Sequence, residues 1–177
     1  MSLWLWTFWT YSFLGYLLER GYAIATHADR QARKCFLLLP MCPVYGLGAL
    51  AVLALPAALT DGFWRSALWG GLAATAVEYA VHLAYDRLLG VRFWDYSHIR
   101  GNLRGRICLP FSLAWSLLVA AGLPVIQAAI APALAAVPPT ATYAALLVFT
   151  ADTVVSLQLL RRAGDPAVLS LGNLRAA

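Results

Sequence analysis

The sequence predicts an all-α protein, a polytopic membrane helix bundle with about five transmembrane helices. Two observations support this class. Hydrophobic residues make up 62% of the 177-residue chain and charged residues only 12%, which is about half the charged fraction of a soluble domain. Long apolar runs, each near the ~20 residues that cross the hydrocarbon core, alternate with short polar gaps. The length suits a single domain.

The N-terminal part of the chain contains the first two predicted spans, at residues 3–25 and 44–60. No basic segment precedes the first run and no A-x-A cleavage site follows it, so we expect this helix to persist in the mature protein. Pro40 and Pro43 interrupt the apolar run before the second span. Because proline breaks helices, we predict a broken or re-entrant segment before helix 2.

The remaining three spans are predicted at residues 67–88, 107–129 and 141–160. A polar connection separates the third span from the fourth, and a proline-rich turn separates the fourth from the fifth. All five spans belong to one transmembrane domain, residues 1–162, and residues 163–177 are predicted to form a cytoplasmic tail.

The basic residues predict the orientation of the bundle. With the N-terminus outside and the C-terminus inside, all 13 Lys and Arg residues except Arg65 fall on the inner side, as the positive-inside rule requires. Basic residues confined to these gaps act as orientation signals, so the net charge of +5 does not indicate a nucleic-acid partner. The three cysteines lie near the predicted cytoplasmic side, where disulfides are rare, and we expect none.

Ionisable residues inside the predicted spans need a physical reason, because each costs at least ~2.5–3.5 kcal/mol on insertion scales. Glu78, His82 and Asp86 lie at i, i+4 and i+8, along one stripe of the third helix. Glu19 lies in the first span and Asp152 in the fifth. A polar cavity open to the cytoplasm would satisfy most of these groups. Alternatively, Glu78 with His82 is an interhelical pair that fixes packing, and Asp152 serves either structural pairing or function.

The connection between the third and fourth spans is the densest polar segment. Its arginines, mixed with Trp and Tyr, suit lipid phosphate or an anionic substrate, whereas Asp95 or Ser97 could simply cap a short helix. Glu78 and His82 give only two ligands at helical spacing, so we expect no metal. The chain contains no Ser-His-Asp spacing, Walker loop or HExxH sequence, and we expect no cofactor.

Several stretches of the chain resemble a known family. The most specific are Gly90-Val91-Arg92-Phe93-Trp94-Asp95-Tyr96-Ser97 and Asn102 with Gly105-Arg106-Ile107-Cys108-Leu109, and residues 11–19, 40–49, 78–79, 111–112 and 115 also match. The chain is similar over residues 7–130 to small bacterial membrane proteins called putative ABC-transporter type IV, or CmpB-like, permeases, which the animal transmembrane protein 229 group also resembles. The resemblance implies a permease-like protein and carries over these candidate substrate-binding residues: Glu19, Tyr45, Glu78, Trp94, Asp95, Asn102 and Arg106. His82 and Asp152 are secondary candidates from their position alone.

Three functions remain open from the sequence. The first is a permease-like protein that binds or moves a small polar or anionic solute. The second is an intramembrane enzyme for a lipid or membrane-anchored substrate, with Asp95 or Glu78 as base and Arg106 as anion clamp. The third is a structural or regulatory membrane module. For each we expect a multi-pass protein of a bacterial plasma (inner) membrane, with membrane lipids as partners and either a homo-oligomer or partner membrane subunits. The usual coupling-loop motif is missing, so an ATPase partner stays open.

Overall fold

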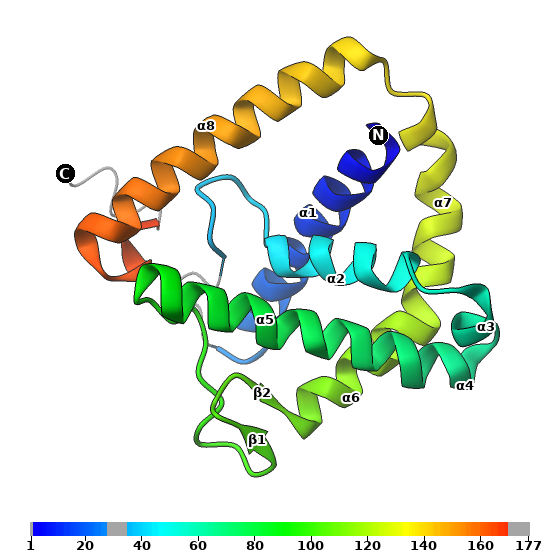
Figure 1. Cartoon of the computed structure of the whole chain (residues 1–177), viewed down its shortest axis with the longest axis horizontal. Coiled ribbons are helices and arrows are strands. Elements are labelled where there is room, and N and C mark those ends of the chain that lie inside the picture. The colour runs from blue at the N-terminus through cyan, green and yellow to red at the C-terminus, as the bar shows by residue number, and fades with distance from the viewer. Residues whose placement is uncertain (1, 28–34, 170–177) are drawn as a thin grey trace.

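The computed structural model describes residues 2–27 and 35–169, and these residues form a helical protein with one short hairpin (Figure 1). The α-helices are α1 (Ser2–Ala25), α2 (Pro43–Leu53), α3 (Ala57–Thr60), α4 (Phe63–Arg65), α5 (Gly71–Leu89), α6 (Leu109–Leu117), α7 (Leu123–Ala135) and α8 (Pro139–Ala163). Two π-helical turns, η1 (Ser66–Gly70) and η2 (Leu118–Gly122), join α4 to α5 and α6 to α7, and a 3-10 turn, η3 (Pro166–Leu169), follows α8. Strands β1 (Asn102–Leu103) and β2 (Ile107–Cys108) pair antiparallel, with Asn102 opposite Cys108.

The helices correspond to the predicted spans with one clear difference. Helix α1 follows the first span, η1 with α5 the third, the continuous stretch from α6 to α7 the fourth, and α8 the fifth. The second predicted span is divided, because α2 ends at Leu53 and the chain turns at Pro56 into the single turn of α3. The 11 residues of α2 extend only about 16 Å at 1.5 Å per residue.

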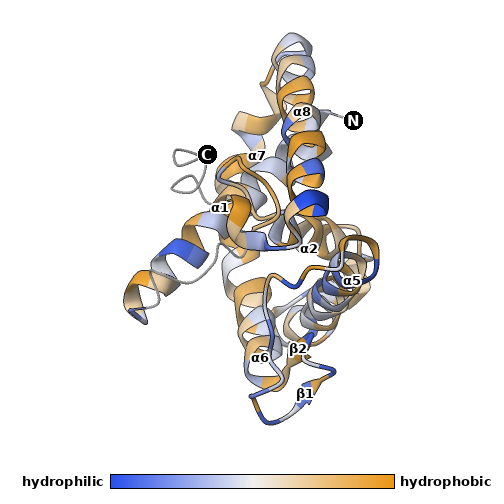
Figure 2. Ribbon diagram, turned by 90° about the vertical axis from the view of Figure 1, so that its left-hand side faces the viewer, coloured by the Kyte–Doolittle hydropathy of each residue, from blue (hydrophilic) through white to orange (hydrophobic). Residues whose placement is uncertain are grey.

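Two helical stretches of the described residues are long and apolar enough to cross a membrane, namely Leu109–Ala135 and Pro139–Ala163. The count of five spans and the N-out, C-in orientation stay predictions. Figure 2 shows hydrophilic residues at the C-terminal ends of α1 and α8 and in the hairpin, with hydrophobic residues along most of α6 and α8.

Proline and glycine set the helix ends in the expected asymmetric way. Helices α2 and α8 both begin with proline, whose fixed φ suits the first helical position. Helices α5 and α8 are each followed by a left-handed glycine, Gly90 with φ 66° and Gly164 with φ 65°, whose N–H groups bond back to the last turn. The chain bends between α6 and α7, where the π-helical turn η2 precedes Pro124 (Figure 1).

Small residues let the central helices approach closely. A Cβ atom on Gly71 of α5 would overlap Ser116 of α6, and one on Gly46 of α2 would overlap Ser12 of α1. Close approach through small residues is typical of helices that pack in membranes. Helices α1, α2, α5 and α6 are therefore held at short distances, and the space between them is fixed by specific glycines.

The predicted irregular segment before α2 is present as an extended, bent stretch from residue 35 to residue 42. Asp152 of α8 accepts hydrogen bonds from the N–H groups of Leu38 (3.2 Å) and Leu39 (3.3 Å). The N–H of Cys42 donates to the carbonyl of Ser12 at 2.8 Å. Backbone N–H groups that lie outside a regular helix and away from water need such partners, so Asp152 has a structural role here.

One feature of this segment contradicts the expectation that the chain has no disulfide, and a separate contact involves the predicted tail. Cys35 and Cys42 form a disulfide, with Cα atoms 4.8 Å apart, because the bent segment brings two residues within the usual disulfide distance. The beginning of the predicted tail also packs. Leu169 in η3 is fully buried in a cluster with Val91, Phe93 and Leu160. This cluster joins the C-terminal ends of α5 and α8.

Candidate functional site

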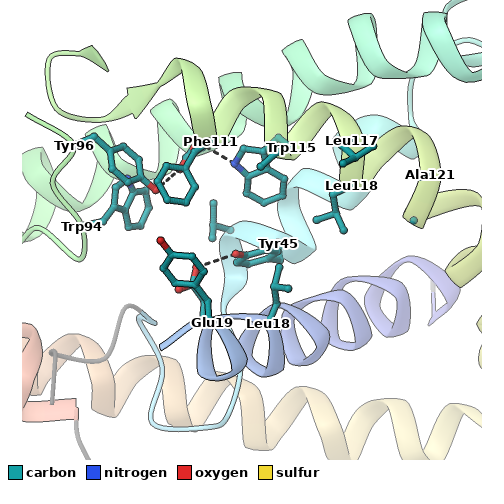
Figure 3. Close-up of a pocket in the computed structure, with 15 residues that line it drawn as sticks. Leu18, Glu19, Tyr45, Trp94, Tyr96, Phe111, Trp115, Leu117, Leu118 and Ala121 are labelled. Atoms are coloured by element: carbon teal, nitrogen blue, oxygen red, sulfur yellow. Dashed lines mark hydrogen bonds between the residues drawn. The ribbon is translucent and has the colours of Figure 1, made fainter. Parts of the chain in front are cut away.

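A cavity of about 500 Å³ lies between α1, α2, α5, α6 and the connection that follows α5. Figure 3 shows Leu18 and Glu19 on α1 facing Phe111 and Trp115 on α6, with Tyr45 between the two helices. Its walls are mainly aromatic and aliphatic, with two carboxylates, and the residues that define it are Leu18, Glu19, Tyr22, Val44, Tyr45, Glu78, Trp94, Tyr96, Phe111, Ala114, Trp115, Leu117, Leu118, Ala121 and Gly122. A mostly apolar cavity with a few polar groups is the usual form of a small-molecule site.

Glu78 on α5 is the most deeply buried ionisable group at this cavity, with 4% of its surface exposed. Its two carboxylate oxygens each accept one hydrogen bond, from the Tyr96 hydroxyl and from the Trp115 indole N–H, both at 3.0 Å. A carboxylate can accept about four hydrogen bonds, so capacity for a ligand remains. In the described part of the chain, both ion pairs are made by Asp86, and Glu78 has only neutral donors.

Glu19 on α1 is linked to Glu78 through two aromatic side chains. The Tyr45 hydroxyl donates to Glu19 at 2.8 Å, and the Tyr45 ring lies 4.9 Å from the Trp115 ring, whose N–H reaches Glu78. Gly15 makes this arrangement possible, because any Cβ at that position would overlap the Tyr45 ring. The two carboxylates are therefore arranged around one cavity by residues from four segments.

The aromatic wall on the other side comes from the connection between α5 and α6. The Tyr96 ring stacks on Phe111 with centroids 4.9 Å apart and planes at 16°. The Trp94 indole N–H donates to the carbonyl of Arg106 at 2.9 Å, and the His82 ring nitrogen Nε2 lies 3.0 Å from the carbonyl of Trp94. His82 thus holds the backbone that carries Trp94, and it does not line the cavity.

Asp95 and Asn102 stabilise the hairpin and stand outside the cavity lining. The Ser97 backbone N–H donates to Asp95 at 2.8 Å, and this hydrogen bond holds the pKa of the Asp95 carboxyl below its usual value. Asn102 donates to the carbonyl of Ile99 at 2.7 Å and accepts from the N–H of Gly105 at 3.0 Å. These bonds close turns within one connection.

Arg106 attaches the hairpin to α5. Its guanidinium donates to Asp86 at 2.8 Å and to the Tyr79 hydroxyl at 3.3 Å, and the bond to Asp86 raises the pKa of Arg106. Arg92 contacts the other oxygen of Asp86 at 3.2 Å. Because its guanidinium pairs with Asp86, Arg106 faces α5 and does not line the cavity.

The structure therefore separates the sequence-predicted residues into two groups. Glu19, Tyr45, Glu78 and Trp94 meet at the cavity, whereas the other candidates hold the surrounding framework, namely Asp95, Asn102, Arg106, His82 and Asp152. Sequence reasoning missed the roles of Tyr96, Phe111 and Trp115. These three residues lie in the stretches that resemble the family, and this was the signal that could have identified them as candidates.

A second cavity of about 680 Å³ adjoins the first and is almost entirely apolar. The two cavities share Leu18, Tyr45, Trp115 and Leu118 as lining residues. From these shared residues the second cavity continues between α1, α2 and α7, along side chains such as Leu14, Leu123, Ile126 and Ile130. The pair of cavities thus has a polar end at the carboxylates and a long apolar end.

The chain matches a known protein family. A family model described as Putative ABC-transporter type IV matches residues 6–157, which include every residue that lines the two cavities. No curated protein and no solved structure matches the chain.

Proposed function

Because the chain belongs to the putative ABC-transporter type IV family, we propose that it is a permease-like, multi-pass membrane protein that binds and moves a small polar solute through the cavity at Glu19 and Glu78. The single observation that carries this proposal is Glu78, a buried carboxylate at a cavity of about 500 Å³ with neutral donors as its partners. Ionisable groups at membrane depth commonly mark solute pathways.

The charged residues that line the cavity indicate which type of solute it can bind. Two carboxylates and no Lys or Arg occur among the described lining residues. Arg106, the residue we considered for an anionic solute, pairs with Asp86 instead. The geometry therefore favours a polar solute that is neutral or positive over an anion.

The same contacts weigh against the enzyme hypothesis. That hypothesis placed Asp95 or Glu78 beside Arg106 as base and anion clamp. In the structure Asp95 accepts from Ser97 within its own turn, and Arg106 faces α5. The groups that would act together on a substrate therefore have separate structural partners, and a binding role accounts better for the cavity.

The proposed setting is a bacterial inner membrane with the N-terminus outside and the cavity open to the cytoplasm. The charged ends of α5 and α8 are joined by one buried cluster that includes Val91 and Leu160. Aromatic contacts to Phe111 attach the end of α1, through Tyr22, to the start of α6. The positive-inside rule assigns the basic residues near these ends to the cytoplasmic side. A few spans rarely form a complete transporter, so we propose a homo-oligomer or partner membrane subunits.

The test uses the full chain in lipid nanodiscs and three probes of similar size: choline, glucose and glutamate. We expect at least one non-anionic probe to raise the melting temperature, since ligands that bind only the folded state stabilise it. Glu78→Gln should abolish this shift, and Asp61→Asn, which removes an exposed carboxylate outside the lining, should retain it. Uptake of the bound probe into proteoliposomes then tests movement. Absence of any shift, or an equal shift in Glu78→Gln, contradicts the proposal.

A further inference from the structure

We propose, on the basis of the function proposed above, that the solute is an amphipathic organic cation. Its ammonium group would lie between Glu19 and Glu78, and its hydrocarbon chain would occupy the adjoining apolar cavity. The proposal rests on the continuity of two cavities of opposite character, which share Leu18, Tyr45, Trp115 and Leu118.

The polar end has the chemistry of a cation site. Taking a carboxylate out of water is costly unless it is paired, and Glu78 is 4% exposed with only a phenol and an indole as donors. Glu19 likewise accepts from a phenol, that of Tyr45. A bound cation would supply the missing positive charge for both groups.

The aromatic residues around the carboxylates strengthen this assignment. Rings of Tyr45, Trp94, Tyr96, Phe111 and Trp115 line the same cavity. Cations bind to the faces of such rings, and quaternary ammonium groups are typically recognised by aromatic cages. Sugars and other neutral polar solutes would need more hydrogen-bonding side chains than the carboxylates and tyrosines found here.

The apolar cavity is the reason for proposing a hydrocarbon chain on the solute. The second cavity, of about 680 Å³, is lined by aliphatic side chains and small residues of α1, α2 and α7. Gly48 of α2 borders it, and a Cβ built there would meet only the Trp115 ring, at 3.9 Å. Space is therefore available beside Gly48, next to the Trp115 ring, which lines both cavities. A hydrocarbon chain attached to the ammonium group could occupy this space.

The experiment measures binding to the full chain in nanodiscs through the fluorescence of its tryptophans, since Trp94 and Trp115 line the first cavity. Three probes distinguish the contribution of the ammonium group (the head) from that of the hydrocarbon chain (the tail). Dodecyltrimethylammonium has both, and tetramethylammonium has the head alone. Dodecanoate has a hydrocarbon chain of the same length with a negative head. Empty nanodiscs correct for partition into lipid. We expect dodecyltrimethylammonium to bind more tightly than tetramethylammonium, and dodecanoate to show no saturable binding.

Two variants test where the ammonium group and the hydrocarbon chain bind. Glu78→Gln should weaken dodecyltrimethylammonium binding by about 30-fold or more, because it removes one partner of a buried charge pair. Gly48→Leu fills the apolar end and should weaken binding of the dodecyl cation by about tenfold more than that of tetramethylammonium. Asp61→Asn is the matched control for loss of a carboxylate. If Glu78→Gln does not fold, Glu19→Gln replaces it.

Each contrary result has a distinct meaning. Saturable binding of dodecanoate that equals that of the cation, or binding unchanged in both Glu variants, overturns the cation assignment. Equal affinity for the two cations, with no selective effect of Gly48→Leu, overturns the tail assignment. If neither cation binds while choline or glucose stabilises the wild type through Glu78, this inference fails and the proposed binding function stands.

Discussion

Gly15 is the residue on which the position of Tyr45 depends. The two residues lie on neighbouring helices, and a Cβ on Gly15 would overlap the Tyr45 ring, whose hydroxyl donates to Glu19. Gly15 is buried on α1. A Cβ placed on Gly21, on the same helix, would have no neighbouring atom within 4 Å. The two glycines therefore form a matched pair for substitution.

Gly15→Ala should lower the free energy of unfolding by about 1–3 kcal/mol, since the added methyl group forces the Tyr45 ring out of place. Gly21→Ala should leave stability unchanged or raise it by up to about 1 kcal/mol, because alanine is the better helix former. Thermal and denaturant unfolding in nanodiscs measures both. Equal stability of the two variants would contradict the close approach of α1 and α2.

Tyr96 couples the hairpin connection to Glu78. Burial, and then the nearby Glu78 carboxylate, raise the pKa of the Tyr96 hydroxyl, so this hydroxyl stays protonated as a donor. Tyr96→Phe keeps the ring on Phe111 and removes only the 3.0 Å hydrogen bond. We expect a loss of about 1–3 kcal/mol of stability, the usual cost of removing a donor to a buried charged acceptor.

The control is Tyr143→Phe, because Tyr143 is 66% exposed and its substitution should change stability by less than about 0.5 kcal/mol. Denaturant unfolding followed by circular dichroism compares the two. A Tyr96→Phe variant as stable as Tyr143→Phe would show that Tyr96 is not a structural donor to Glu78.

At this residue scale the sequence predicted the cavity only in part. Glu19 and Glu78 were identifiable because an ionisable residue inside an apolar run is costly. The absence of Arg106 from the cavity lining was not predictable. Its partner Asp86 is 20 residues away, and the sequence pattern alone does not indicate which face of a hairpin an arginine occupies. Tyr96 and Trp115 were not identified as lining residues, since aromatic residues are common both in helix cores and at membrane interfaces.

Among the elements, the segment before α2 shows best what local sequence determines. Pro40 and Pro43 predicted the break, because proline removes a backbone donor. The partner that stabilises the break, Asp152, lies 113 residues beyond Leu39, and no local pattern links the two. Similarly, the second span was predicted as continuous because residues 44–60 are apolar, and the end of α2 at Leu53 depends on a turn at Pro56.

Asp152→Ala should destabilise the protein by about 1–3 kcal/mol, because it removes the acceptor of the Leu38 and Leu39 N–H groups. Amide hydrogen exchange should accelerate at these two residues. Thr153→Ala is the control on the same helix, since its hydroxyl bonds to the preceding turn of α8, at the Phe149 carbonyl. Unchanged exchange at Leu38 in Asp152→Ala would refute the structural role.

For the whole molecule, the number of spans determines where the two termini lie. An odd number places them on opposite sides of the membrane and an even number on the same side. The decisive element is α2, because 11 residues extend only about half of the ~30 Å hydrocarbon core. Only α2 together with its neighbouring irregular segments would provide the second crossing.

Reporter fusions to each terminus test this directly. We expect a periplasmic reporter to be active at the N-terminus and a cytoplasmic reporter at the C-terminus, as all basic residues but Arg65 predict. A fusion at Asp61 should report the outer side. Reporters that place both termini in the cytoplasm would mean that α2 is re-entrant and that the protein has an even number of spans.

The wall formed by Trp94 and Tyr96 belongs to a connection between helices, and this has a kinetic consequence. The connection leaves α5 at Gly90, which has φ 66°, and closes on itself at Gly105, which has φ 69°. Glycines in this region can change dihedral angles at little steric cost. The hydrogen bonds of this wall include those from the Trp94 indole to the Arg106 carbonyl and from the Tyr96 hydroxyl to Glu78. We therefore expect exchange of a bound molecule to follow the microsecond fluctuations of a loop.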